Sequence, residues 1–340
     1  MRLRAIARLL KLPYAWAHGL VLRDLQSLVR VHFLYAAAST GLLHALKKPA
    51  SREELIRQLR VERPDLLESL LALGVSLGEL SLKGGFYRVR GVRAKAFMER
   101  RNDPLVAMVE EYATYHSSVY QELGERLRGG PLGDYMAGRG NLIARSSRML
   151  EPFIADFARA LVAKRGAVRV LEVGCGSGIY MKHVAEANAQ AKGIGIDMQP
   201  EVVSQAALNL RRWGIKGRFR VVLADIRQPT AELSGPFDII TLYNNIYYFP
   251  PEERPALFRS LRERLASGGR LAVVSAMRGA SVTTNDFDLV LRSTLGCTAL
   301  PDTEELRAQL LGSGFDHVAG TRLAPIESFY GLIATREAGA

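Results

Sequence analysis

A glycine-rich loop that follows an apolar run is the first feature of this sequence that could do chemistry. Residues 170–178 read VLEVGCGSG, so a short buried strand is expected to lead directly into Gly174, Gly176 and Gly178. Glycines let the backbone approach a ligand closely, and a helix expected from Ile179 would present its free N–H groups there. A strand, loop and helix of this kind is typical of cofactor sites, but alone it does not separate a dinucleotide from other adenosine derivatives.

Two acidic residues follow the next two expected strands. Asp197 ends the apolar run at residues 193–196, where a carboxylate can accept hydrogen bonds from both hydroxyls of a ribose. Asp225 follows the run at residues 219–224, and together with Ile226 it offers an acceptor and an apolar face to an adenine ring. The spacing therefore predicts an adenosine site built from three consecutive strands.

Two further expected strands extend the same sheet. Residues 237–242 form a fourth apolar run that ends in Tyr243, Asn244 and Asn245. The sequence SGGR at residues 267–270 is expected to turn into a fifth strand at residues 271–275. Ligands of open α/β sheets bind outside the carboxyl ends of the strands, so these segments are expected to line one crevice.

This arrangement resembles the class I S-adenosylmethionine-dependent methyltransferases, from about residue 149 to the end of the chain. Residues 170–178 match the first motif of that family, and Asp197 and Asp225 with Ile226 match its ribose and adenine positions. Residues 265–271 resemble the turn before its fifth strand, while residues 303–315 and 328–334 resemble its last helix and closing hairpin. The resemblance implies an α/β fold with a Rossmann-like, seven-stranded domain.

The resemblance also implies the activity and its site. We expect S-adenosylmethionine (SAM) as cofactor and methyl transfer to oxygen or carbon of a small, apolar or aromatic molecule. The cofactor contacts that it implies are Glu172, Gly174, Cys175, Gly176, Gly178, Asp197, Met198, Asp225, Ile226, Tyr243 and Asn244. Because a methyl sulfonium is already a strong electrophile, the protein has mainly to align the acceptor and exclude water.

The chain departs from the plant-type O-methyltransferases at their catalytic histidine, which lies just beyond the fourth strand. The matching position here holds Tyr248, and a neutral tyrosine is a poor base because its ordinary pKa is about 10. His116 is the candidate substitute, in a segment rich in polar and aromatic groups that is either a pocket wall or a connector helix. The candidate substrate contacts are Tyr112, Tyr115, His116, Asn245, Tyr247 and Tyr248.

The first hundred residues predict a separate, mainly helical domain. Helical spacing at residues 25–36 and 42–47 precedes a capping box at Ser51 and Glu54 and a first-turn proline at Pro64. A β-hairpin is expected at residues 79–89, and helices followed by a hairpin are typical of a winged helix. Residues 25–89 resemble the winged-helix dimerisation domain found ahead of small-molecule O-methyltransferase domains. We expect this domain at residues 1–100, a helical connector and pocket wall at 101–150, and the SAM-binding domain at 151–340.

A winged helix either binds DNA or holds a dimer together. The expected helix at residues 66–73, LLESLLAL, offers no Arg, Lys, Asn or Gln to a base edge, which favours a homodimer over a nucleic-acid partner. A DNA-binding regulator stays open as an alternative, because residues 1–100 carry 18 Lys and Arg against 8 Asp and Glu. An oxidoreductase with a dinucleotide cofactor is the other alternative, since it would share the glycine loop and the ribose acid.

The leader at residues 1–12 mixes Arg2, Arg4, Arg8 and Lys11 with leucine and isoleucine. We expect a short amphipathic helix that packs on the protein or makes a weak contact with an anionic membrane surface. No run of 18 uncharged apolar residues occurs, and the 2 cysteines exclude a disulfide framework and a cysteine-built zinc site. We therefore expect a cytoplasmic enzyme, peripheral to a membrane at most, with no metal cofactor.

Overall fold

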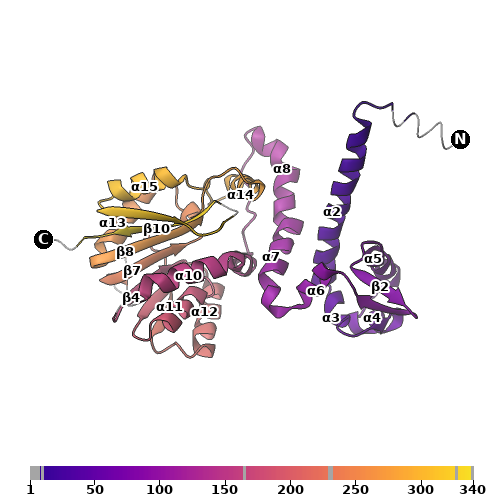
Figure 1. Ribbon diagram of the computed structural model, residues 1–340, viewed down its shortest axis with the longest axis horizontal. Helices are drawn as coiled ribbons and strands as arrows, with labels where there is room; N and C mark the ends of the chain where they lie inside the picture. The colour runs from indigo at the N-terminus through magenta and orange to yellow at the C-terminus, as the bar shows by residue number, and fades with distance from the viewer. Residues whose placement is uncertain (1–7, 9–10, 164–165, 229–232, 326–327, 338–340) are drawn as a thin grey trace. The chain divides into compact units, whose positions relative to one another are not determined.

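The computed structural model describes residues 8, 11–163, 166–228, 233–325 and 328–337 (Figure 1). The chain divides into two compact units, Met1–Ser117 and Ser118–Ala340. The division falls within the segment that the sequence predicts as a helical connector. Each unit is described by itself below.

A seven-stranded sheet forms the centre of the second unit, as the sequence predicts. Its strand order is β6-β5-β4-β7-β8-β10-β9. The first five strands in this order run parallel, while β10 pairs antiparallel with both β8 and β9. The strands are β4 (Arg169–Val173), β5 (Lys192–Asp197), β6 (Phe219–Leu223), β7 (Phe237–Tyr243), β8 (Leu265–Ala276), β9 (His317–Arg322) and β10 (Phe329–Thr335). The α/β fold class is therefore confirmed.

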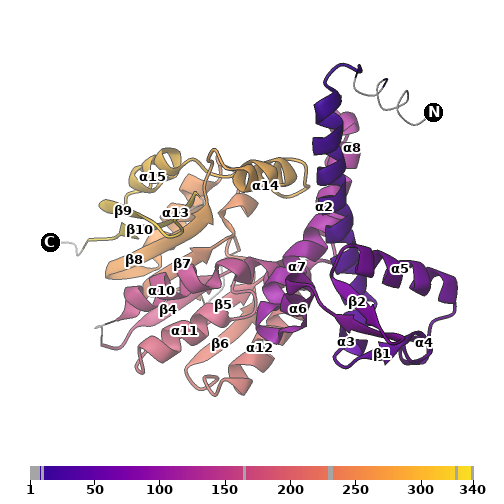
Figure 2. The same ribbon diagram turned by 45° about the vertical axis from the view of Figure 1, so that its right-hand side comes forward.

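Helices cover both faces of this sheet, which explains why its strands read as nearly continuous apolar runs (Figures 1 and 2). Leu171 and Val173 of β4 belong to the core that includes the apolar residues of α13 and α15, whereas Val170 belongs to the core beneath α10 and α11. Successive side chains of a strand point to opposite faces, so one short strand serves both cores. The helices of this unit are α8 (Ser117–Leu127), α9 (Gly140–Ser146), α10 (Glu151–Val162), α11 (Ile179–Ala187), α12 (Pro200–Arg212), α13 (Arg254–Glu263), α14 (Val282–Arg292) and α15 (Thr303–Gly312), with the short helices η3 (Ser147–Leu150) and η5 (Ile246–Tyr248).

The turn expected at residues 267–270 is wrong in detail. The strand β8 already begins at Leu265, which pairs with Phe237, and the next pair along the ladder joins Arg270 to Ile239. Residues 266–269 therefore bulge out of a strand that continues on both sides of them, with Gly268 in the left-handed region at φ 73°. The glycines that signalled a turn serve this bulge instead.

The first unit is mainly helical and contains the expected hairpin. Its helices are α2 (Ala15–Ser39), α3 (Leu42–Ala45), α4 (Arg52–Leu59), α5 (Pro64–Ser76), α6 (Val92–Met98) and α7 (Asp103–Glu111), with the short helices η1 (Arg100–Asn102) and η2 (Tyr112–His116). The hairpin strands β2 (Leu80–Lys83) and β3 (Phe86–Val89) are joined by the unpredicted β1 (Ala50–Ser51) in the order β1-β3-β2. The capping box is confirmed: the Ser51 hydroxyl accepts from the Glu54 N–H at 3.2 Å, and the Ser51 N–H donates to the Glu54 carboxylate at 2.7 Å.

None of the helices in the described part of the chain has the length and apolarity that a bilayer crossing requires. Within the same residues, no cluster of three or more His, Cys, Asp and Glu side chains could hold a metal ion. Cys175 and Cys297 are free thiols. Most of the basic leader, residues 1–7 and 9–10, lies outside the described residues.

Candidate functional site

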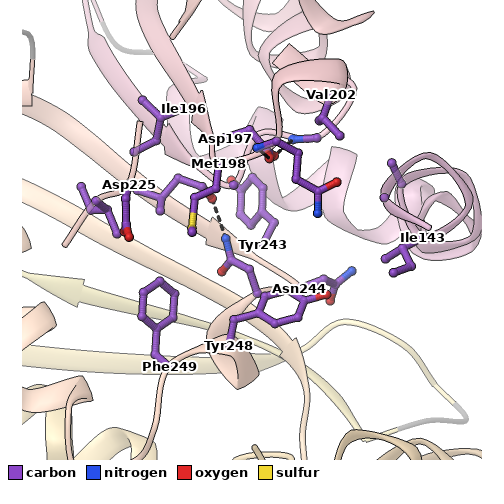
Figure 3. Close-up of a pocket in the computed structure, with 18 of the residues that line it drawn as sticks. Ile143, Ile196, Asp197, Met198, Val202, Asp225, Tyr243, Asn244, Tyr248 and Phe249 are labelled. Atoms are coloured by element: carbon purple, nitrogen blue, oxygen red, sulfur yellow. Dashed lines mark hydrogen bonds between the residues drawn. The ribbon is translucent and has the colours of Figure 1, made fainter. Parts of the chain in front are cut away.

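A cavity of about 590 Å³ opens at the carboxyl ends of β4, β5, β6 and β7 (Figure 3). It brings together most of the residues that the sequence predicts for the site. The predicted residues that line it are Gly174, Gly176, Asp197, Met198, Asp225, Ile226, Tyr243, Asn244, Asn245, Tyr247 and Tyr248. Parallel strands end at one edge of a sheet, so residues as far apart in the chain as Gly174 and Tyr248 share this crevice.

The glycine loop after β4 has backbone conformations that favour glycine, and Gly174 also lacks room for a side chain. A Cβ atom on Gly174, whose φ is 65°, would lie 2.5 Å from the amide nitrogen of Asn245. That nitrogen in turn donates to the Val173 carbonyl at 2.6 Å, which ties the end of β7 to the end of β4. Gly176 also has a positive φ, 51°, and its N–H donates to the Asp197 carboxylate at 3.1 Å. Only glycine adopts this backbone readily, so the loop keeps its surface open to a ligand.

Asp197 is held in place by backbone donors at the end of β5. Its carboxylate accepts from the N–H groups of Gly176 and Gln199, both at 3.1 Å. Burial raises the pKa of Asp197, and these hydrogen bonds oppose that rise. A fixed acceptor on the cavity wall suits a ligand that carries hydroxyl groups.

Asp225 forms a close ion pair with Arg227, which the sequence analysis did not single out. The Arg227 Nε lies 3.0 Å from both carboxylate oxygens, its Nη2 lies 2.8 Å from Oδ2, and its backbone N–H donates to Oδ1 at 2.9 Å. Burial acts to raise the pKa of Asp225, but the hydrogen bonds and charge of Arg227 outweigh it and lower that pKa. Asp225 is therefore a firmly ionised acceptor in the cavity wall.

The other end of the cavity is aromatic. The rings of Tyr247 and Tyr248 meet edge to face with their centroids 4.8 Å apart, and the Tyr248 hydroxyl lies 3.8 Å from the sulfur of Met136. Asn244, at φ 54°, is one of three non-glycine residues with a positive φ in the described chain, and strain of this kind concentrates at functional sites. The buried Oδ1 of Asn245 has no hydrogen-bond partner among the described residues. A polar ligand at this point would satisfy it.

Three predicted cofactor residues are buried and do not line the cavity. Glu172 is 3% exposed, and burial, followed by the nearby charge of Asp197, raises its pKa to about 8. Cys175 is buried too; its N–H donates to the Ile196 carbonyl at 2.8 Å, and burial raises the pKa of its thiol. Gly178, at φ 77°, precedes the first residue of α11. The three support the loop from within the fold.

The remaining predicted residues belong to the unit Met1–Ser117. Tyr112, Tyr115 and His116 lie in η2, a single π-helical turn between α7 and α8. The His116 ring is 5% exposed and stands 4.4 Å from the Tyr112 ring and 4.7 Å from the Tyr115 ring, centroid to centroid. The structure thus brings these three residues together. The residues that line the cavity all come from the unit Ser118–Ala340.

The sequence predicts a pocket wall within residues 101–150 but does not name the residues of α9 and η3 that line this cavity. The missed lining residues there are Gly140, Ile143, Ala144 and Ser147, and those elsewhere include Met136, Gln199, Val202, Arg227, Phe249 and Gly296. One signal was available, because the break at residues 138–140 is rich in glycine. A Cβ on Gly140 would lie 1.8 Å from the Gln199 side-chain oxygen, so this helix starts against the segment that follows Asp197.

The features of this cavity fit an adenosine-containing cofactor: a glycine loop that side chains would fill, two carboxylates on neighbouring strands, and a buried polar atom without a partner. Comparison with known proteins agrees. Residues 170–269 match the family model described as a methyltransferase domain.

Two curated relatives are O-methyltransferases by name. The chain is 24% identical over 310 residues to demethylspheroidene O-methyltransferase from Cereibacter sphaeroides, which covers 85% of this chain and 79% of the relative. It is 32% identical over 122 residues to ubiquinone biosynthesis O-methyltransferase from Xanthomonas axonopodis pv. citri. That match covers 36% of this chain and spans about half, 48%, of the relative.

Solved structures share the fold over nearly the whole chain. Mitomycin 7-O-methyltransferase superposes with a TM-score of 0.77 at 17% identity, covering 95% of this chain and 98% of that one. Human N-acetylserotonin methyltransferase, solved in complex with SAM, gives a TM-score of 0.73 at 16% identity, with the same coverage of 95% and 98%. The chain therefore carries a methyltransferase domain at residues 170–269 and has the fold of these methyltransferases over nearly its whole length.

Proposed function

We propose that the cavity binds SAM with the ribose on Asp197, the adenine beside Asp225 and Ile226, and the methionine portion along the glycine loop. The observation that carries this assignment is the pair of carboxylates at the ends of β5 and β6, which face one cavity beside a glycine loop in the left-handed conformation. The ribose acid and the adenine acid of such a site lie on neighbouring strands. Met198, Tyr243 and Asn244 line the same cavity and complete the proposed cofactor contacts.

Bound SAM supplies a methyl group on a positively charged sulfur, which is a strong electrophile. The residues of the chain then have to hold an acceptor in line with that group and keep water away. The aromatic end of the cavity suits this task, because the side chain of Tyr247 there is only 6% exposed. The hydroxyl of Tyr248 would orient an acceptor rather than deprotonate it, because phenols are poor bases. His116 remains the proposed base where the acceptor needs one.

The acceptor that we propose is an oxygen of a small, apolar or aromatic molecule. The lining at the Tyr248 end favours it, since rings and the thioether of Met136 bind apolar surface. The relatives named above act, by their names, on demethylspheroidene and in ubiquinone biosynthesis. Both names specify transfer to oxygen, which favours oxygen over carbon here.

Calorimetry with S-adenosylhomocysteine (SAH), the stable product of the cofactor, tests the assignment. Asp197→Ala should weaken SAH binding by about tenfold or more, the scale of hydrogen bonds lost to a charged acceptor. Asp156→Ala is the control, because this carboxylate on α10 has a side chain 84% exposed and does not line the cavity. Unchanged SAH affinity in Asp197→Ala would remove the ribose assignment.

A homodimer formed through residues 1–100 is part of the proposal. The N-terminal half of α2 exposes large apolar side chains, including Trp16 at 70% and Leu22 at 60%, and Leu66 on α5 is 59% exposed. Several large apolar side chains exposed along one helix are typical of an interface. Light scattering should give a dimer for the full chain and a shift towards monomer for Leu22→Glu; a monomeric full chain would contradict the proposal.

The leader remains a proposed weak membrane contact of a cytoplasmic enzyme. Each Lys or Arg near an anionic bilayer contributes about 1 kcal/mol, and salt screens it. Co-sedimentation with anionic vesicles at rising ionic strength, with and without residues 1–12, measures the contact. If neither protein sediments at low salt, the leader does not bind membranes.

A further inference from the structure

The two side chains of the ion pair between Asp225 and Arg227 are unequally exposed. Both residues line the cavity, yet the Asp225 side chain is only 14% exposed while that of Arg227 is 45% exposed. The arginine thus covers the carboxylate from the outer side. Its guanidinium lies 6.0 Å from the ring centroid of Phe249, and its Nη2 lies 3.7 Å from the sulfur of Met198, so neighbours on two other segments flank it.

The donors that Arg227 directs at the Asp225 carboxylate limit how many further hydrogen bonds this carboxylate can accept. A carboxylate has about four lone-pair positions. Arg227 directs three donors at them: its backbone N–H at 2.9 Å, its Nε–H at 3.0 Å from both oxygens, and its Nη2–H at 2.8 Å. About one position is left for a ligand in the cavity, and the carboxylate cannot rotate without breaking the fork.

A carboxylate that cannot rotate can distinguish two purines that differ at position 6. Adenine presents an amino group there, which donates to an acceptor. Hypoxanthine presents a 6-oxo group, an acceptor, and carries its donor one atom away on N1. A free carboxylate could turn to meet that N1–H, whereas a fixed one would face the 6-oxo group and repel it.

We propose that Arg227 is a positioning residue that fixes the Asp225 carboxylate and thereby makes the site select a 6-aminopurine over a 6-oxopurine. This inference rests on the proposed function, because it takes the adenine to lie beside Asp225. Arg227 does not touch the reacting atoms in this account. It acts through the orientation and the charge of Asp225, and the lowered pKa of that carboxyl keeps it an acceptor.

Binding of two probes to the full-length protein tests the proposal: SAH and its 6-oxo analogue S-inosylhomocysteine. The wild type should bind SAH at least about tenfold more tightly than the analogue, the scale of one charge-assisted hydrogen bond exchanged for a repulsion. Arg227→Ala should weaken SAH binding and lower the preference for SAH by about threefold or more, since the freed carboxylate adapts to either base. Arg227→Lys keeps the positive charge without the fork and should fall between the two.

A matched control exists in the first unit. Arg63 and Asp65 form the same two-residue fork, with Nε at 3.1 Å and Nη2 at 2.8 Å from the carboxylate oxygens, on an exposed surface. Arg63→Ala should therefore leave both affinities and their ratio unchanged. Circular dichroism of each variant checks that it is folded before its affinities are compared.

The outcomes separate the inference from the function beneath it. If the wild type binds SAH and loses it in Asp197→Ala, the cofactor assignment holds and the ratio in Arg227→Ala decides the inference. If Arg227→Ala weakens the binding of SAH and of S-inosylhomocysteine equally, Arg227 only supports the cavity wall. If Arg227→Ala binds SAH more tightly, Arg227 competes with the ligand for the Asp225 carboxylate. Either result overturns the inference. A wild type that binds neither probe overturns the inference together with the proposed function.

Discussion

Glu172→Gln should make the methyltransferase unit more stable at neutral pH and remove much of its pH dependence. Glu172 is the residue before the last in β4, is 3% exposed, and lies near the Asp197 carboxylate. Burial first, and then the charge of Asp197, raise the pKa of Glu172 from 4.5 to about 8. The folded protein therefore keeps this carboxyl protonated at pH values where the unfolded chain ionises it.

The sign and size of the effect follow from that difference. Because the folded state holds a proton that the unfolded state has lost, stability is fully present below pH 4.5 and falls as the pH rises towards 8. Each pH unit inside this window costs about 1.4 kcal/mol, so the wild type should lose about 3 kcal/mol between pH 5.5 and pH 7.5 from this group. Glutamine is neutral at both pH values and nearly isosteric, so the variant should not show this loss.

Urea unfolding followed by tryptophan fluorescence measures the unfolding free energy of the unit Ser118–Ala340, which contains Glu172. The chain has 2 tryptophans, Trp16 and Trp213, so a Trp16→Phe background leaves a reporter at the end of α12. Glu263→Gln, at an exposed carboxylate on α13, is the control and should follow the wild type at both pH values. Equal pH dependence in the wild type and Glu172→Gln would refute the reasoning that the buried carboxyl is protonated in the fold.

Three further changes have expected outcomes. Gly174→Ala should weaken SAH binding in calorimetry and lower the free energy of unfolding in urea by roughly 1–3 kcal/mol, because the new side chain must adopt φ 65° and lies against Asn245. Gly217→Ala is the control: a Cβ there has nothing within 4 Å, so both the SAH affinity and the unfolding free energy should stay unchanged. Ser51→Ala should lower the unfolding free energy of the first unit by about 1 kcal/mol, since α4 loses the acceptor of its capping box; an unchanged urea midpoint would contradict this. Arg254→Met should lower the unfolding free energy of the second unit by about 2 kcal/mol, because Arg254 is 1% exposed and its Nε donates to the Phe249 carbonyl at 3.0 Å. A variant as stable as the wild type would show that this hydrogen bond does not contribute to stability.

The sequence predicted the parts of the site that a single strand and its following residue define. Asp197 and Asp225 each come directly after a segment that reads as a strand, and parallel strands must end at one edge, so their shared cavity followed from the chain alone. The capping box at Ser51 was equally readable, because it is a local pattern of two residues three apart.

What the sequence left unpredicted depends on tertiary placement. A pocket wall was expected within residues 101–150, but no motif marks Ile143 and Ser147, which only the fold brings to the cavity. The π-helical turn at Tyr112–His116 was not predicted, because a composition rich in polar and aromatic groups does not specify the pattern of backbone hydrogen bonds. Arg227 resembles any exposed arginine in a loop until its fork with Asp225 is seen. Glu172 was expected to face the cofactor, but alternation along β4 places it inside the fold, where its burial could not be read from the motif.

A crystal structure of the full chain with SAH bound tests the central claim most directly. The account predicts both ribose hydroxyls within hydrogen-bond distance of the Asp197 carboxylate and the adenine amino group on Asp225. It also places the sulfur towards the aromatic end of the cavity, near Tyr248. SAH bound elsewhere, or with its adenosine turned away from these two carboxylates, would contradict the account.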